Sequence, residues 1–555
     1  MMRTIYVSLL LVLSVAFSVE AQLHKRNFTS PLNIPIRLSG SFCEIRSDHF
    51  HSGIDIKTNG REGLPVFAVG NGYVYRVKVS AVGYGKAIYI MHPGNILSVY
   101  GHLSAFTGAL ADTIEAIQYR NRSFETEYFP DSNLFRVAKR EQIAWSGNSG
   151  GSEAPHLHFE IRDQLKEEPL NPLLYDWFAE DTIPPVINSV QLYNYIYDSF
   201  IPVDKNINDG DTLNADSDSI AFSFESTDMM NDGMPSDLGI YSATLIQGKD
   251  TVYQFANDRM NFDQTRYVNA HIDYSKKSFT GRKYQRMFNL PGNKSEQFKS
   301  SGNGVVRIRD AVLKPFLLTV SDVNGNYSQV RFYVSYTDHP VKKVILPAVS
   351  YPSPAIVKRW KDVEVEIPEN SFYEPVFKLD IEKQKKINGF PAVAVGPKGI
   401  ILRIPYRLRF IFDRKKEEEG KYVIVSLNEN NKVITSLKSI TKGRMTTAIS
   451  YRPGLFSIAV DTVSPLVDSL HFETDSLIKR SFFIIRITDN LSGISDYTCK
   501  VDGKWFLFEY DPKKNRLVAD AKKLPGVFNV ETEVTDNCNN VTVKKATVKK
   551  PLLGD

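Results

Sequence analysis

Apolar and polar residues alternate over short stretches of this chain, and the alternation predicts β-strands. In 63–79, "GLPVFAVGNGYVYRVKV", apolar side chains recur at every second position on either side of Gly70 and Gly72, which we interpret as turn or bulge positions. Further strands are predicted at 86–92, "KAIYIMH", and at 96–103, "ILSVYGHL". These short strands between glycine-rich turns favour a mainly β fold class.

One segment of the front half has helical spacing instead. Leu110, Ile114 and Ile117 follow Phe106 at offsets of 4, 8 and 11 residues, which places all four on one face of a helix. The next segment, "SFETEYF", has the pattern of a strand. We expect this helix and strand to form an insertion at about 105–137.

The rear of the chain contains two copies of one pattern. "DTIPPVINSVQL" (181–192) resembles "DTVSPLVDSLHF" (461–472), and "LGIYSATLIQGKD" and "VSDVNGNYSQVRF" have partners in the same order in "SGISDYTCKVDGK" and "VTDNCNNVTVKKA". Short strands with Gly, Asn, Asp and Pro between them are typical of immunoglobulin-like β-sandwiches. Asp322 and Asp536 occupy equivalent positions, where we expect them to cap turns; calcium binding is the alternative. Another strand-rich stretch, 341–460, separates the copies.

The N-terminus has the features of a signal peptide. Arg3 precedes an apolar run from Ile5 to Phe17, and Val19 and Ala21 fit a cleavage site near Gln22. The run is shorter than the ~20 residues that span a bilayer, and no later segment is apolar enough to do so. We therefore expect an exported protein with no membrane span after cleavage, located in the periplasm, bound to the cell envelope, or secreted.

These patterns divide the chain into successive parts. We expect a signal peptide at 1–21, a front domain at 22–178, an immunoglobulin-like β-sandwich at 179–340, a β-rich module at 341–460, a second immunoglobulin-like β-sandwich at 461–548 and a tail at 549–555.

Composition supports several soluble domains and no nucleic-acid partner. At 555 residues, of which 42% are hydrophobic and 24% charged, the chain is long enough for three or four domains of ~150 residues. The net charge of +5 is too small and too spread to indicate nucleic-acid binding. Of the three cysteines, Cys499 and Cys538 can pair in an oxidising compartment and Cys43 is left over. Any metal site must therefore use histidines and carboxylates.

The histidines are concentrated in the front domain, where seven of the ten occur within the first 160 residues. His156 and His158 lie two apart in "SEAPHLHFEIR". In a strand both imidazoles face the same side, with Leu157, Phe159 and Ile161 on the opposite, buried face. A half-buried strand is therefore predicted, and a metal is one natural partner for its two imidazoles.

A second pair of candidate ligands stands in "DHFHSGIDI". His51 and Asp55 have an even spacing that puts both on one side of an extended segment, and Gly53 allows close backbone approach. Catalytic zinc takes three protein ligands from His, Asp or Glu and leaves one position for water. We therefore expect His51, Asp55 and one histidine of the later pair to bind zinc, with His102 nearby; His49 is an alternative ligand.

Five blocks in this order resemble the lysostaphin/LytM family of zinc peptidoglycan endopeptidases over about residues 40–165: "HSGID", "GLPVFAVGNGYV", "GYGKAIYIMHPGN", "VYGHL" and "IAWSGNSGGSEAPHLHFEIR". The resemblance implies a mostly β fold of the duplicated hybrid motif type with a narrow groove. The stretch between Leu103 and Ala138 is longer than the family pattern, which bears on substrate preference rather than on chemistry.

The resemblance also implies the site. Zinc is held by His51, Asp55 and His158, and His102 and His156 act beside it as catalytic residues. Zinc held this way polarises a water that attacks a peptide carbonyl, while the oxyanion needs a donor and the leaving amine a proton. Because the chain has no HExxH motif, a histidine must replace the glutamate base of zincins. Which of His102 and His156 does which stays open.

Two further residues are predicted to bind substrate. Tyr100 stands two positions before His102, and its hydroxyl is a donor for a substrate carbonyl. Glu160 shares the strand face of His156 and His158. For Glu160, orienting an imidazole and lying in solvent are the alternatives.

The sequence therefore predicts an exported zinc metalloendopeptidase that hydrolyses peptide cross-links of bacterial peptidoglycan, with the stem peptides as its partner. The alternative is a catalytically inactive member of the family that serves as a wall-binding or regulatory scaffold. A third reading, a general secreted metalloprotease, fits the metal site but not the five blocks.

Overall fold

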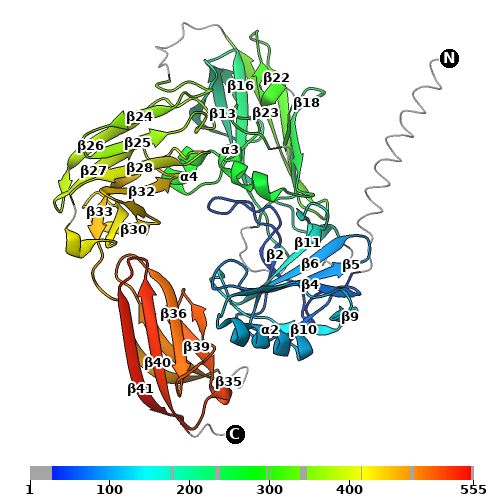
Figure 1. The fold of residues 1–555 in the computed structure, drawn as a ribbon. Helices are drawn as coiled ribbons and strands as arrows, with labels where there is room; N and C mark the ends of the chain where they lie inside the picture. Colours follow the sequence, from blue (N-terminus) through cyan, green and yellow to red (C-terminus); the bar gives the residue numbers. More distant parts are fainter. Residues whose placement is uncertain are drawn as a thin grey trace.

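The computed structural model describes residues 28–175, 177, 181–231, 238–295, 298–300, 302–337, 347–413, 415–475 and 480–551. The signal peptide expected at 1–21 lies outside these residues. Within them the chain forms four β-rich units in succession, and the last, drawn in red, returns beside the first, drawn in blue (Figure 1). The predicted mainly β fold class is confirmed.

The front unit is built on a nine-stranded sheet that carries the histidine-rich segments. Its main path runs through β1 (Leu38–Gly40), β2 (Ile54–Lys57), β11 (His156–Asp163), β6 (Ile96–Leu103), β5 (Lys86–His92), β4 (Gly72–Val79) and β8 (Thr126–Tyr128), with β12 (Glu168–Leu170) paired to β11 and β9 (Arg136–Val137) paired to β4. A three-stranded sheet contains β3 (Pro65–Phe67), β10 (Gln142–Trp145) and β7 (Ala105–Phe106). The helices are α2 (Gly108–Asn121) and the 3-10 turn η1 (Pro172–Leu174).

The predicted insertion forms a helix followed by a short strand. In α2, Leu110 and Ile114 are buried, as the helical spacing predicts. Phe106 lies before the helix, in β7, so the helical stripe begins one turn later than expected. Arg122 ends the helix in a left-handed conformation with φ of 49°, and β8 follows.

Three further units each contain two sheets. The second unit comprises β13 (Val186–Ile196), β14 (Ser199–Ile207), β15 (Thr212–Ala215), β16 (Ser219–Thr227), β17 (Ser242–Gln247), β18 (Asp250–Ala256), η2 (Phe262–Tyr267), α3 (Val268–His271), α4 (Tyr274–Thr280), β19 (Gln285–Arg286), β20 (Phe298–Ser300), η3 (Gly302–Gly304), β21 (Val306–Arg307), β22 (Lys314–Ser321) and β23 (Tyr327–Tyr336). The third comprises β24 (Ile356–Arg359), β25 (Val363–Ile367), β26 (Asp380–Ile387), β27 (Phe390–Gly396), β28 (Tyr406–Ile411), η4 (Lys416–Glu418), β29 (Tyr422–Leu427), β30 (Val433–Leu437), β31 (Ile440–Lys442), β32 (Met445–Ser450) and β33 (Gly454–Val460).

The fourth, which we call the C-terminal unit, has the sheets β34-β35-β39-β38 and β37-β36-β40-β41. Its elements are β34 (Leu466–Asp475), β35 (Arg480–Thr488), β36 (Ile494–Val501), β37 (Lys504–Trp505), β38 (Glu509–Asp511), β39 (Arg516–Asp520), η5 (Ala521–Lys523), β40 (Val527–Asp536) and β41 (Val541–Lys549). Cys499 and Cys538, which the sequence left open as a pair, are both free thiols inside separate clusters of apolar side chains.

The two sequence copies contain the same turn. Asp322 accepts a hydrogen bond from the backbone N–H of Asn326 at 2.8 Å, and Asp536 accepts one from Asn540 at 2.9 Å. Each asparagine side chain also donates to its aspartate at 2.7 Å. The prediction that these aspartates cap turns is therefore confirmed.

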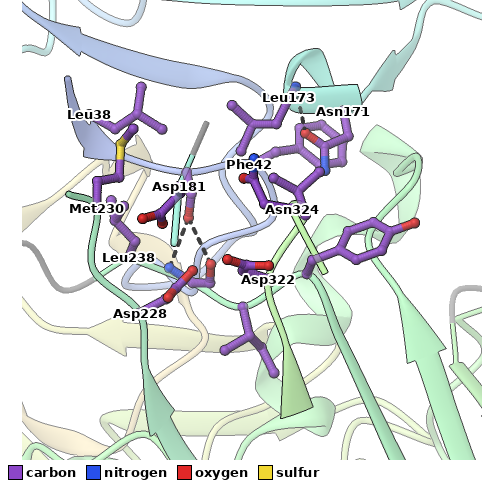
Figure 2. A pocket seen from close by; sticks show the side chains of 15 residues that line it. Leu38, Phe42, Asn171, Leu173, Asp181, Asp228, Met230, Leu238, Asp322 and Asn324 are labelled. Carbon is purple, nitrogen blue, oxygen red and sulfur yellow. Dashed lines mark hydrogen bonds between the residues drawn. The ribbon is translucent and has the colours of Figure 1, made fainter. Parts of the chain in front are cut away.

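The front and second units share one core. A continuous cluster of buried side chains extends across both, from Leu32 to Val334. At their seam a pocket is lined by Phe42 of the front unit and by Asp181, Asp228 and Asp322 of the second (Figure 2). Burial, together with the neighbouring Asp322 carboxylate, raises the pKa of Asp228 to about 7. The second unit is therefore packed directly behind the segment that precedes the first predicted ligand.

Candidate metal centre

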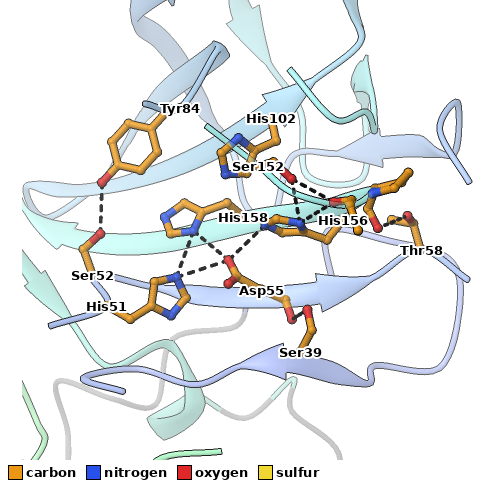
Figure 3. Close-up of polar contacts among 12 residues, drawn as sticks. Ser39, His51, Ser52, Asp55, Thr58, Tyr84, His102, Ser152, His156 and His158 are labelled. Atoms are coloured by element: carbon orange, nitrogen blue, oxygen red, sulfur yellow. Dashed lines mark hydrogen bonds and ion pairs between the residues drawn. The ribbon is translucent and has the colours of Figure 1, made fainter. Parts of the chain in front are cut away.

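The antiparallel pairing of β2 with β11 brings the predicted ligands together. Asp55 lies directly opposite His158 in this pairing, and His51 comes just before β2. The Oδ1 atom of Asp55 is 2.9 Å from Nδ1 of His158 and 3.1 Å from Nε2 of His51 (Figure 3). One ligand atom from each of the three residues lies within 4.8 Å of the others. Such a set can hold one metal ion.

His156 lies on the same side of β11 as His158, as its even spacing predicts. Its Nε2 is 3.2 Å from Oδ1 of Asp55. Leu157 and Phe159, on the opposite face, are fully buried. The prediction of a half-buried strand is wrong in one respect: on the histidine face, His158 and Glu160 are also buried, His158 being only 3% exposed, and His156 alone stays partly exposed.

The imidazoles of the two histidine ligands are oriented by hydrogen bonds on their far side. His51 donates from Nδ1 to the backbone oxygen of Ser41 at 2.9 Å, and His158 donates from Nε2 to Oε1 of Glu160 at 2.8 Å. A neutral imidazole carries one N–H, so these bonds leave Nε2 of His51 and Nδ1 of His158 as lone-pair donors facing Asp55. The donor set therefore fits zinc in both identity and orientation.

The second unit supports this arrangement from behind. Ser41, whose carbonyl orients His51, exchanges hydrogen bonds through its hydroxyl with the backbone of Gly239, receiving one at 2.8 Å and donating one at 3.2 Å. A Cβ at Gly239 would lie 3.1 Å from Cα of Glu44, so the two segments touch through their backbones. The orientation of one ligand is thus tied to a loop of the next unit.

His102 reaches the site through a bulge in β6. The pairing of β6 with β5 shifts register between Lys86 and Ile88, and His102 adopts a left-handed φ of 57°. Its Nδ1 donates to the backbone oxygen of Ser149 at 2.8 Å. The ring centroid lies 4.8 Å from that of His156. The bulge therefore turns an otherwise core-facing position toward the metal centre.

The same bulge explains why Tyr100 does not take part. Alternation along a regular strand would put Tyr100 and His102 on one face. Instead Tyr100 is fully buried, packs against Phe159, and its hydroxyl accepts hydrogen bonds from Val69 N and from Ser98. A side chain enclosed in the core cannot contact substrate, so this prediction is corrected.

Glu160 is also enclosed, and the prediction that it binds substrate is corrected in the same way. It is fully buried and accepts hydrogen bonds from Tyr84 OH at 2.6 Å, Ser52 Oγ at 2.7 Å and Arg162 Nε at 2.5 Å, besides that from His158. Its geometry is that of the alternative, a carboxylate that orients an imidazole. Arg162 lies two residues after Glu160, on the same face of the strand, so the spacing in the sequence could have indicated this partner. Tyr84 and Ser52 come from other segments and gave no local signal.

His49, the alternative ligand, lies outside the cluster. Its side chain is exposed and pairs with Asp48 at 2.9 Å. The backbone N–H of His51 bonds to Glu44 and its carbonyl to Cys43, which directs His51 inward while His49 stays outside.

Burial and neighbouring charges shift the pKa values of His102 and His158 in opposite directions. Burial acts to raise the pKa of Asp55, but the surrounding imidazoles outweigh it and hold the pKa well below the usual range. Burial acts to lower the pKa of His158, but Asp55 and Glu160 outweigh it and raise the pKa to about 9. For His102, burial and the neighbouring His158 and His156 lower the pKa to about 3. His102 is therefore neutral at pH 7.

The fold and the site together define a β-rich protein with a buried cluster of histidine and carboxylate side chains that can hold a metal ion. Peptidase family M23 matches residues 49–119. Over 116 residues the chain is 31% identical to the lipoprotein NlpD of Yersinia enterocolitica, a match that covers 21% of this chain and 93% of that protein. Over 123 residues it is 32% identical to the DD-carboxypeptidase/endopeptidase Mpg of Neisseria meningitidis serogroup B, covering 22% of each. The chain thus spans about a fifth of the length of that relative.

Among solved structures, the catalytic domain of the antimicrobial peptidase lysostaphin from Staphylococcus simulans matches 25% of this chain and 86% of its own, with 23% identity and a TM-score of 0.18. A zinc-containing peptidase from Vibrio cholerae matches 28% of this chain and 41% of its own, with 21% identity and a TM-score of 0.21.

The chain belongs to peptidase family M23, a family of metallopeptidases, which confirms the resemblance drawn from the five sequence blocks. No helix in the described part of the chain is both long and apolar enough to cross a membrane. The individual roles of the five histidine and aspartate side chains stay predictions.

Proposed function

We propose that this protein is an exported zinc metalloendopeptidase that hydrolyses peptide cross-links of bacterial peptidoglycan. The observation that carries the proposal is the cluster of His51, Asp55 and His158, whose ligand atoms lie within 4.8 Å of one another with the imidazoles already oriented. Membership of family M23 and the likeness to a protein named as a carboxypeptidase and endopeptidase support the reaction class.

In this proposal the chain's own residues position and exchange protons around the metal. Zinc, when bound, supplies Lewis acidity that makes a water nucleophilic near pH 7. His102 is neutral and donates from Nδ1 to Ser149, so its Nε2 is free to accept a proton. His156 donates from Nδ1 to the backbone oxygen of Ala154 at 2.8 Å, and its Nε2 faces Oδ1 of Asp55 at 3.2 Å, beside the candidate metal position. The two imidazoles then serve proton transfer and oxyanion stabilisation.

The test combines metal analysis with digestion of purified cell wall. We expect the wild-type protein to bind one zinc ion and to release peptides with new ends from peptidoglycan. His102→Ala should retain zinc and lose activity by about 10²–10⁴-fold, the range for removal of a general acid or base. The matched control is His49→Ala, which removes an exposed imidazole two positions before the first ligand, His51, and should leave both readouts unchanged.

Three outcomes separate the candidate functions. Zinc binding with new peptide ends supports the proposal. Absence of both zinc and cleavage in the wild-type protein favours the inactive scaffold. Cleavage of denatured proteins without cleavage of cell wall favours a general secreted metalloprotease.

A further inference from the structure

The loop that contacts the imidazoles of His102 and His156 is itself contacted from the far end of the chain. This loop, 147–153, carries the carbonyl of Ser149 that accepts from His102, and Ser152, whose Oγ lies 3.1 Å from Nδ1 of His156. Lys513, in the turn between β38 and β39 of the C-terminal unit, donates from Nζ to the backbone oxygens of Asn148 and Ser152, the latter at 2.7 Å.

A second contact from the same hairpin meets the other side of the loop. Glu509 in β38 pairs with Nζ of Lys86 at 2.6 and 2.8 Å. The backbone N–H of Lys86 donates to Oγ of Ser149 at 2.9 Å, and that hydroxyl donates to the carbonyl of Leu103 at 2.7 Å. The C-terminal unit therefore contacts two neighbours of Ser149: Lys86, which bonds to its hydroxyl, and Asn148, which precedes it in the chain.

The centre of the loop is glycine and packs directly on backbone. Gly150 has a φ of 72°, and a Cβ there would lie 2.3 Å from the backbone nitrogen of Gly85. The backbone N–H of Gly151 donates to Gly83 at 2.7 Å. This side of the loop is thus fixed by backbone contact alone, and side-chain contacts to its flanking carbonyls come from Lys513.

From this geometry we propose that Lys513 and Glu509 of the C-terminal unit are positioning residues for His102 and His156. The inference rests on the proposed function, and it deepens it: peptide cleavage depends on the C-terminal unit being docked on the front unit. The metal ligands lie on or beside β2 and β11 and do not contact the hairpin, so zinc binding is independent of this docking.

The experiment compares substitutions in the full-length protein. On soluble cross-linked peptides released from peptidoglycan, Lys513→Ala should lower kcat about tenfold with little change in KM, because a small misplacement of a catalytic group has effects of this order. Glu509→Gln should act in the same direction, and Lys513→Arg should restore most of the rate because it keeps the donors. The Kd for zinc should equal that of the wild-type protein in all three.

A matched control separates positioning from docking in general. Lys523, in the same unit, pairs with Glu115 of α2 and does not contact the loop. Lys523→Ala should leave kcat unchanged. Amide hydrogen exchange in 147–153 should accelerate in Lys513→Ala and not in Lys523→Ala, which reports the loop directly and without turnover.

The outcomes are distinct. An unchanged or increased kcat in Lys513→Ala, or an equal loss in Lys523→Ala, overturns the inference. If the wild-type protein binds zinc but cleaves no peptide, the proposed function fails, and the inference falls with it. If the wild-type protein cleaves and only the loop contacts alter kcat, both stand.

Discussion

His158 lies between two carboxylates, and this position couples metal binding to pH. Asp55 faces its Nδ1 and Glu160 its Nε2, and together they raise its pKa to about 9 despite burial. A metal at Nδ1 must displace the proton that this pair of carboxylates stabilises. Glu160 keeps the remaining N–H pointed away from the metal, so the same carboxylate both orients the ligand and sets its proton affinity.

We therefore predict that zinc affinity rises with pH up to about 9. Below the raised pKa of His158 each zinc ion releases one proton, so the apparent Kd should fall by about tenfold per pH unit between pH ~7 and ~8.5. The measurement is chelator competition across this range. Glu160→Gln removes one of the two carboxylates that raise the pKa, and should move the curve to lower pH.

The stability of the zinc-free protein depends on pH in the opposite direction to the zinc affinity. Because the folded pKa of His158 is raised, its charged form stabilises the zinc-free protein fully below pH ~6.5, and this contribution is lost as pH rises through about 9. A zinc affinity that does not change over this range would contradict the coupling.

At the scale of elements, the glycine-rich loop before β11 packs against the turn before β5 without side chains between them. A Cβ at Gly150 would lie within 2.6 Å of three backbone atoms, two of Gly85 and one of Gly83. Backbone atoms cannot move aside as a flexible side chain can. The glycines in "SGNSGGS" and "GYGK" are thus required by close approach as much as by turn conformation.

Gly150→Ala should therefore destabilise the front unit and reduce peptide cleavage. Left-handed φ costs a residue with Cβ ~1 kcal/mol, and the steric overlap should add ~1–3 kcal/mol. Gly60→Ala is the control, because Gly60 has the same φ of 72° but open space around its Cβ position. Urea unfolding of both variants gives the two costs; equal losses would contradict the steric argument.

At the scale of the whole molecule, the four units follow one another in an arc, and the C-terminal unit returns to contact the front unit at α2 (Figure 1). Tyr119 of α2 meets Trp505 and Phe506 edge-on, with ring centroids 5.3 and 6.3 Å apart. The predicted insertion thus forms a contact surface for the C-terminal unit. This contact accounts for the aromatic Tyr119 on the otherwise polar outer face of α2.

Trp505→Ala should weaken this docking. Loss of an aromatic pair and of buried apolar area should cost ~2 kcal/mol of docking free energy. Amide exchange in α2 should then accelerate by more than tenfold, since 1.4 kcal/mol is a factor of ten. Val543→Ala, at an exposed position of the same unit, should leave exchange unchanged. No acceleration in Trp505→Ala would show that polar contacts alone maintain the interface.

The sequence by itself determined what depends on local spacing. Period-two alternation predicted the strands, the repeated "DT" blocks predicted two copies of one unit, and the even spacings of His51 with Asp55 and of His156 with His158 predicted that each pair shares a side. These are properties of neighbouring residues, and strand geometry alone converts them into direction.

Only the tertiary structure decided what depends on contacts between distant segments. The bulge at His102 turned that side chain toward the site and left Tyr100 in the core, and the covering of β11 buried Glu160 among residues from three segments. Lys513 meets the carbonyl of a residue 361 positions earlier. A bulge cannot be predicted from the alternation of apolar and polar residues. Nor does a local pattern indicate which remote side chain contacts a loop, because that contact depends on how whole units pack.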